Sequence, residues 1–304
     1  LPASYFKGLN FLLNEQPDKA IEAFIEVAKV NPQTIELHFA LGSLFRRRGE
    51  VERAIRMHQN LAEREDLAQE QKLQALLELA QDYLKAGLLD RAEELFLKLD
   101  DTPHAEAALR FLLEIYEQEK EWRKAIVIAE KLEVLNGNSF QKEIANFYCE
   151  MAARELMQSR PAEARPFLTE ALQHHRLCVR ANMLLGDLER DLGNRPAAIA
   201  AWQRIESQNP AYLSLVAERL LNAYRDNGHA EEGLNLLRGF LDKYASQDLL
   251  DMVYQATLTS SGAQAAYRLV RDEVRRTPTL LGLDKLLEAQ LLDVPVERRN
   301  DLEL

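Results

Sequence analysis

Two pairs of residues in this sequence have side chains that could hold a metal ion or form a disulfide. His174 and His175 suggest a metal site, but neighbouring residues on a helix point about 100° apart, so they cannot easily hold one ion together. The C-terminal end of a helix, where its dipole favours a positive or polar group, explains the pair better. Cys149 and Cys178 lie 29 residues apart without a CxxC pairing. This spacing favours two reduced cytosolic thiols over a disulfide.

The known catalytic motifs are absent from the sequence. It contains no Gly-rich loop that could cradle a phosphate, no HExxH helix, no GxSxG turn and no paired cysteine motif. The acidic side chains are numerous and scattered, as expected for a solvated helical surface, so no pair is assigned as general acid and base. We therefore expect a chain that is not an enzyme and that holds no cofactor of its own.

Charge and hydropathy limit the kinds of partner. The formal net charge is −11 and the pI is near 5.2, which argues against nucleic acid or an anionic membrane surface as the main ligand. No apolar run approaches the roughly 18 residues of a membrane span. We expect a soluble array whose partners are proteins.

The sharpest local feature is the run Arg46-Arg47-Arg48, followed by Gly49, at the C-terminal end of a predicted helix. Cations at this end complement the helix dipole, and the glycine caps the helix. The same three cations could instead bind an acidic loop of a partner or approach lipid headgroups. The sequence leaves both explanations open.

The element that positions these residues is a helical hairpin that recurs with a period of 34 residues. Its clearest copy runs from Met183 to Pro210. Small side chains are needed at the eighth and twentieth positions, where two antiparallel helices come closest, and Gly186 and Ala198 occupy them. Gly193, near the fifteenth position, can adopt the left-handed conformation that ends the first helix, and Pro210 ends the second.

This pattern resembles the tetratricopeptide repeat. Few Gly and Pro residues and many strong helix formers agree with an all-α fold. The resemblance implies a solenoid of antiparallel hairpins wound into a right-handed superhelix, and we expect one continuous domain. The expected repeats are 1–34, 35–68, 73–106, 106–139, 145–178, 179–212, 214–247 and a weak copy, 247–280, in which only Ala266 and Pro278 are well placed. Residues 281–304 are expected to form a capping helix and a truncated following helix, Val296 to Leu304.

In arrays that resemble this one, the second, fifth, ninth, twelfth and thirteenth residues of each repeat line the concave side. Such positions mix Arg, Met, Phe and carboxylates here, which suits a polypeptide ligand. A solvated helix face is the alternative for each single residue. The candidate protein-binding residues are Phe39, Ser43, Arg46, Arg47, Gln81, Lys85, Arg110, Glu114, Met183, Asp187 and Arg190, and the next repeat adds Glu218, Asn222, Arg225 and Asp226.

A closer resemblance extends beyond the generic repeat positions. The run from Gly42 to Gln59 is similar to the second repeat of the lipopolysaccharide assembly protein B family, and shorter stretches match in the same order at 10–13, 146–150 and 276–279. The family implies a non-catalytic adaptor on the cytoplasmic side of the bacterial inner membrane. It is anchored by an N-terminal membrane helix and carries a C-terminal rubredoxin-type domain that binds iron or zinc through four cysteines.

The same resemblance implies the partners. They are a membrane AAA+ metalloprotease, the deacetylase that commits to lipid A, and lipopolysaccharide assembly and transport proteins, with degradation of the deacetylase restraining lipopolysaccharide synthesis. This sequence has neither the membrane helix nor the four cysteines, so we expect it to be an excised repeat region. Within the repeats, the resemblance implies a functional surface only for the stretch from Arg46 to His58. Dimerisation is left open.

Two other functions are considered. A co-chaperone-like module that clamps a peptide carboxylate would need Lys and Asn at the fifth and ninth positions of successive repeats, and the pairs here do not match: they are Phe39 and Ser43, Leu77 and Gln81, and Arg110 and Glu114. The regulatory portion of a larger enzyme stays open as a second alternative.

Overall fold

The computed structural model describes residues 6–8, 10–11, 14, 16–30 and 34–293. Within these ranges the chain is helical and contains no strand, which confirms the predicted all-α fold. Pro2, Pro32 and the expected final helix from Val296 to Leu304 lie outside the described residues.

The helices belong to two compact units, residues 1–140 and 141–304. The first unit contains α2 (Pro17–Val30), α3 (Ile35–Arg47), α4 (Val51–Ala62), α5 (Gln69–Lys85), α6 (Leu89–Leu97), α7 (Ala105–Gln118) and α8 (Trp122–Asn136). The second contains α9 (Gln141–Met157), α10 (Pro161–His174), α11 (Val179–Asp191), α12 (Arg195–Gln208), the short η1 (Pro210–Tyr212), α13 (Ser214–Asp226), α14 (Ala230–Tyr244), α15 (Gln247–Ser261), α16 (Ala263–Arg276) and α17 (Leu280–Asp293).

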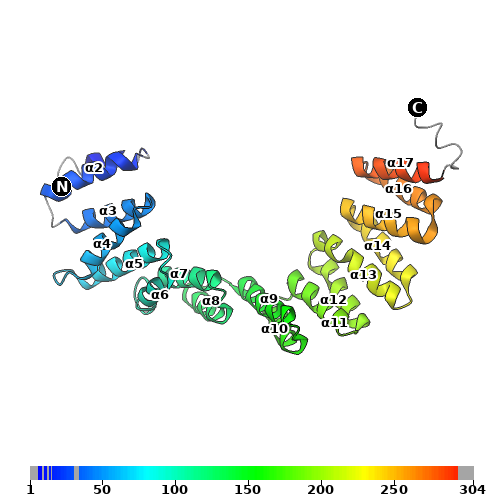
Figure 1. Cartoon of the computed structure of the whole chain (residues 1–304), viewed down its shortest axis with the longest axis horizontal. Coiled ribbons are helices and arrows are strands. Elements are labelled where there is room, and N and C mark those ends of the chain that lie inside the picture. The colour runs from blue at the N-terminus through cyan, green and yellow to red at the C-terminus, as the bar shows by residue number, and fades with distance from the viewer. Residues whose placement is uncertain (1–5, 9, 12–13, 15, 31–33, 294–304) are drawn as a thin grey trace. The chain divides into compact units, whose positions relative to one another are not determined.

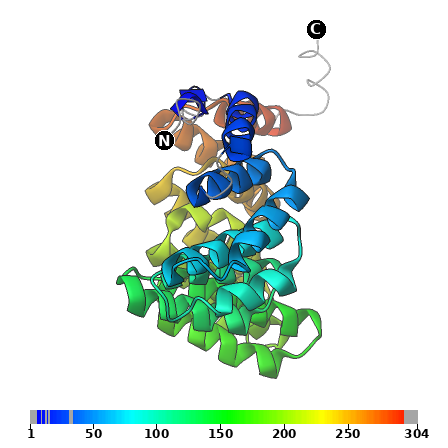
Figure 2. The same ribbon diagram turned by 90° about the vertical axis from the view of Figure 1, so that its left-hand side faces the viewer.

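Within each unit, successive helices pack as hairpins, such as α3 with α4 and α11 with α12 (Figures 1 and 2). The first helices of neighbouring hairpins also contact each other, for example α3 with α5 in the first unit and α13 with α15 in the second. The stacking therefore places the counted positions of the first helices on a shared side of each unit. We call the side chains at those positions the inner face.

The small residue at the eighth position is required by a close approach between the two helices of a hairpin. A Cβ on Gly42 would lie 2.3 Å from the His58 ring, and a Cβ on Gly186 would lie 2.1 Å from the Trp202 indole. Both distances are far below van der Waals contact, so at these two positions only glycine fits opposite the large side chain at the twenty-fourth position.

The fifteenth position is left-handed in successive repeats, whether or not it is glycine. Gly49 and Gly193 both have φ of +78° there. The repeats 106–139 and 145–178 lack a glycine at this point, and Lys120 and Ser159 adopt φ of +58° in its place. The geometry of the turn therefore overrides the local preference of these two residues.

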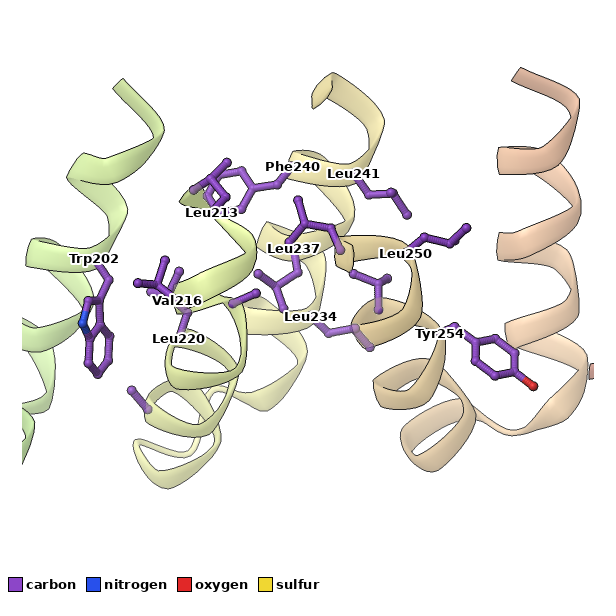
Figure 3. Close-up of a cluster of buried hydrophobic side chains, with 14 of the residues drawn as sticks. Trp202, Leu213, Val216, Leu220, Leu234, Leu237, Phe240, Leu241, Leu250 and Tyr254 are labelled. Carbon is purple, nitrogen blue, oxygen red and sulfur yellow. The ribbon is translucent and has the colours of Figure 1, made fainter. Parts of the chain in front are cut away.

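A continuous hydrophobic cluster runs through the second unit from α12 to α17. Figure 3 shows Trp202, Leu220, Leu237 and Tyr254, from α12, α13, α14 and α15, among its members. Because the cluster extends into α15 and α16, the weakly matched copy 247–280 is packed like its neighbours. This continuity gives the inner face of the second unit a rigid support.

Candidate protein-binding surface

The inner-face residues of α3 contact α5 of the next hairpin. Ser43 Oγ lies 3.4 Å from Glu78 Oε2. Arg46 pairs with the Glu78 carboxylate at 2.6 Å and with the Asp82 carboxylate at 2.7 Å, and Phe39 is half-buried with its ring centroid 6.1 Å from that of His58. Three of the predicted binding residues are thus engaged within the first unit.

Asp82 is the centre of a buried polar network. Its side chain is fully buried, accepts from Arg46 and lies 2.6 Å from His58 Nδ1. Burial lowers the pKa of the Arg46 guanidinium, but the hydrogen bonds from it to Glu78 and Asp82 outweigh this and hold the pKa above its ordinary value. Arg46 therefore neutralises a buried carboxylate, which ties α3 and α4 to α5.

The other cations of the Arg46-Arg47-Arg48 run are placed differently. Arg48 pairs with Asp18 at 2.8 Å and with Glu50 at 3.2 Å. Arg47 is exposed and makes no ion pair within the part of the chain that the structure describes. Of the three, Arg47 has a guanidinium available to a partner.

The predicted residues of α5 and α7 are more accessible. Gln81 is half-buried and Lys85 is exposed. Arg110 pairs with Glu106 at 2.8 Å, and Glu114 accepts from Gln118 at 3.3 Å. These last two contacts join residues four apart on one helix, so they are weak surface interactions that a partner could replace.

On α11 the predicted residues form part of a polar junction with α13. Asp187 pairs with Arg219 at 2.9 Å and lies 3.3 Å from Arg190. Burial raises the pKa of the Asp187 carboxyl above its ordinary value, although both guanidiniums act against this. Met183 is half-buried, and its carbonyl accepts a hydrogen bond of 3.3 Å from the Trp202 indole.

A cavity of about 730 Å³ opens between α13, α14 and α15, and we call it the α13–α15 cavity. Its walls include the inner-face residues of both first helices, and its floor includes apolar side chains of α14. The lining residues are Glu218, Leu221, Asn222, Arg225, Ala230, Glu231, Leu234, Leu237, Arg238, Asp251, Met252, Gln255, Ala256, Thr259, Ser260 and Ser261. Of these residues, Glu218, Asn222 and Arg225 were predicted from their repeat positions.

The α15 wall of the cavity was not predicted, because no inner-face positions were assigned to the repeat 247–280. Counted from Gln247, Asp251, Gln255 and Thr259 are its fifth, ninth and thirteenth residues. The same rule applied to this repeat would have found them. Arg238, on the second helix of its hairpin, has no such signal.

The comparisons with known proteins agree with this geometry. A model of the tetratricopeptide repeat family matches residues 7–66 and 150–212. Lipopolysaccharide assembly protein B of Escherichia coli K12 is 35% identical over 292 residues, which cover 96% of this chain and 75% of that protein. The same protein of Haemophilus influenzae is 34% identical over 304 residues, with 96% and 76% covered.

The chain belongs to the lipopolysaccharide assembly protein B family. Solved structures with similar features include a tetratricopeptide repeat protein of Parabacteroides merdae, with a TM-score of 0.42 and 14% identity over 95% of this chain and all of that one. Another is pilF of Pseudomonas aeruginosa, with a TM-score of 0.38 and 18% identity over 68% and 91%. The repeats and the family together make this chain a scaffold for protein interactions.

The metal centre that we expect in the lipopolysaccharide assembly protein B family does not fit the residues described here. Its four cysteine ligands have no counterpart, since Cys149 and Cys178 are buried with their sulfurs 3.8 Å apart. Within the described ranges no three His, Cys, Asp or Glu side chains are grouped to hold a metal ion. His174 lies 2.8 Å from Gln141 Oε1 and stacks on the Tyr148 ring, so its contacts are internal.

The two thiols influence each other. The hydrogen bond from the Cys149 thiol lowers the pKa of Cys178. Cys178 stands just before α11, where backbone N–H groups also stabilise a thiolate, while burial opposes ionisation.

Among the described helices, none is both long enough and apolar enough to cross a bilayer.

Proposed function

We propose that this chain is the protein-binding array of an adaptor that restrains lipopolysaccharide synthesis by promoting proteolysis of the deacetylase that commits to lipid A. Its membership of a family named for lipopolysaccharide assembly supports the pathway. The observation that carries the binding role is the α13–α15 cavity, whose lining combines apolar, charged and amide side chains. Such mixed chemistry suits a polypeptide.

In this proposal the adaptor acts by proximity. The array binds the deacetylase and a membrane AAA+ metalloprotease together, so each meets the other at a raised effective concentration. The site of action is the cytoplasmic side of the inner membrane, where the protease is anchored. No bond is made or broken by the array, and its contribution is geometry and affinity.

Co-purification tests this proposal directly. The array, produced with the deacetylase and the protease, should retain both on an affinity resin, and its loss from cells should lengthen the half-life of the deacetylase. Gln255→Arg, on the cavity wall, should reduce capture of at least one partner, whereas Gln264→Arg, exposed on α16 outside the cavity, should not. Failure of the unaltered array to retain either protein would overturn the proposal.

A further inference from the structure

The α13–α15 cavity contains a half-buried guanidinium that lacks a carboxylate partner. Arg238, on α14, lines the cavity and makes no ion pair among the described residues. Its Nη2 donates to Thr257 Oγ1 at 3.2 Å and its Nη1 reaches Asn235 Oδ1 at 3.4 Å, both neutral acceptors. Its Nε is buried and has no hydrogen-bond partner. A charge removed from water in this way is costly until an anion pairs with it.

Arg238 differs in this respect from two other half-buried arginines of the chain. Arg46 is paired with two carboxylates, and Arg219 is paired with Asp187. The cation at Arg238 is also held in place, because the fully buried Thr257 hydroxyl donates to the Val253 carbonyl at 2.6 Å and offers its oxygen to the guanidinium. The guanidinium is thus held by two neutral acceptors, and its Nε–H is unpaired.

The carboxylates that line the cavity do not neutralise Arg238. Asp251 is paired with Lys285 at 3.2 Å. Glu218 and Glu231 are exposed, and neither makes an ion pair within the described ranges. Arg225, on α13, is a second guanidinium of the lining without an ion pair in the described residues, and it too is exposed. Water screens exposed charges, whereas the half-buried Arg238 dominates the less solvated part of the cavity.

The remaining lining indicates what surrounds the anion. Leu234 and Leu237 lie between the ribbons of α13 and α15 (Figure 3), and Met252 adds a flexible apolar side chain. Asn222 and Gln255, at the ninth positions of adjacent repeats, place amide groups on the two opposite walls. Amides can donate to and accept from the backbone of an extended peptide.

We propose that the α13–α15 cavity binds an internal peptide segment in which an Asp or Glu side chain pairs with Arg238 next to an apolar residue seated on Leu234 and Leu237. The inference rests on the proposed protein-binding function and specifies the chemistry of the segment that is recognised. Charge complementarity to Arg238 selects the acidic residue. A guanidinium fork and a carboxylate form a two-pronged, charge-assisted hydrogen bond.

A random peptide library displayed on phage, with the peptides fused at their C-terminal end, tests this without knowledge of the partner. Selection on the purified chain should enrich peptides that carry Asp or Glu beside Leu, Ile, Met or Phe. A synthetic copy of an enriched peptide should bind Arg238→Gln about tenfold more weakly, or worse, than the unaltered chain in fluorescence anisotropy. Arg238→Lys keeps the charge but not the fork and should recover only part of the affinity.

Controls separate this result from misfolding. Arg268→Gln removes an exposed arginine of α16 outside the cavity and should bind as the unaltered chain does. Arg225→Gln should weaken binding less than Arg238→Gln, and because Arg225 is exposed, it tests the cavity even if Arg238→Gln does not fold. Circular dichroism melts establish that each variant is folded.

Three outcomes would overturn the inference. The first is a selection with no enrichment of acidic residues, and the second is equal affinity of the peptide for Arg238→Gln and the unaltered chain. The third is enrichment only from a library with free C-termini, which would assign the carboxylate to a chain end. If the array still retains the deacetylase and protease while Arg238→Gln has no effect on them, the adaptor function stands and this inference alone fails.

Discussion

The backbone of Gly186 lies directly against the indole ring of Trp202, so that a Cβ at position 186 would be 2.1 Å from Nε1. The ring cannot easily move away. Trp202 is fully buried, and its indole N–H donates to the Met183 carbonyl at 3.3 Å. At their closest approach, α11 and α12 are therefore held by the glycine at position 186, which leaves room, and by the large Trp202 side chain, which fills it.

Gly186→Ala should lower the free energy of unfolding by roughly 1–3 kcal/mol, because even one added methyl overpacks the crossing of α11 and α12. Urea denaturation measures the change. Gly239→Ala is the matched control, since Gly239 is exposed within α14 and a Cβ there meets nothing within 4 Å. It should stabilise the protein by roughly 0.5–1 kcal/mol through helix propensity. Equal effects of the two variants would refute the proposed packing.

Lys120→Gly should stabilise the protein by about 0.5–1 kcal/mol, although glycine ordinarily weakens folded proteins. Lys120 has φ of +58° at the turn between α7 and α8, where a Cβ is strained, and glycine relieves that strain at some cost in chain entropy. Lys120→Ala keeps the Cβ and should give no such gain. Chemical denaturation distinguishes the two, and a glycine variant that is no more stable than the alanine variant would contradict the prediction.

The fold could be predicted from the sequence because its determinants are local and repeated. Gly186 and Trp202 belong to one hairpin, and equivalent pairs such as Gly42 and His58 recur along the chain. The repeat 247–280 matched weakly because most of its anchor positions depart from the pattern. One of them is Tyr254 at the eighth position, where a small residue is usual, and it is accommodated in the hydrophobic core. Departures at several anchors hide a repeat from pattern matching without preventing its packing.

The functional surface was less predictable, because counting positions gives the direction of a side chain but not its partner. Arg46 was predicted to line the concave side for a partner protein, and in the structure its guanidinium pairs with Asp82 of the next repeat. Arg238 had no sequence signal at all. Its unpaired state depends on which carboxylates the neighbouring helices bring close, and that is a property of the stacked hairpins.

Arg46→Gln should lower the free energy of unfolding by roughly 3 kcal/mol or more, because it leaves the fully buried Asp82 carboxylate without its guanidinium. Arg47→Gln removes the adjacent exposed cation and should leave the melting temperature close to that of the unaltered chain. Circular dichroism melts give both values. If the Arg46 variant melts like the unaltered chain, the buried network does not stabilise the stacking of α3 on α5.

The Arg47 prediction extends to binding. If the inner face of the first unit contacts an acidic partner, Arg47→Glu should weaken capture of that partner while the melt is preserved. Capture by the Arg47→Glu array that equals capture by the unaltered array would remove Arg47 from the binding surface.

The first unit should lose stability in acid partly through Glu93, which joins three helices. Its carboxylate, on α6, accepts from the Tyr116 hydroxyl of α7 at 2.7 Å and from Lys124 of α8 at 3.1 Å. The Tyr116 hydrogen bond is the main cause that lowers the pKa of Glu93 below its ordinary value near 4.5, with Lys124 adding to it and burial opposing it. Because the folded-state pKa is the lower one, the stabilisation is complete above the ordinary value and disappears as the pH falls through the folded-state pKa.

Glu93→Gln should therefore flatten the acid limb of a plot of melting temperature against pH, since the amide still accepts from Tyr116 but does not titrate. Glu130→Gln, exposed on α8 and without an ion pair among the described residues, should keep the limb of the unaltered chain. Tyr116→Phe should reduce the limb by removing the donor that lowers the Glu93 pKa. Coincident curves for Glu93→Gln and the unaltered chain would mean that the proton taken up on acid unfolding binds elsewhere.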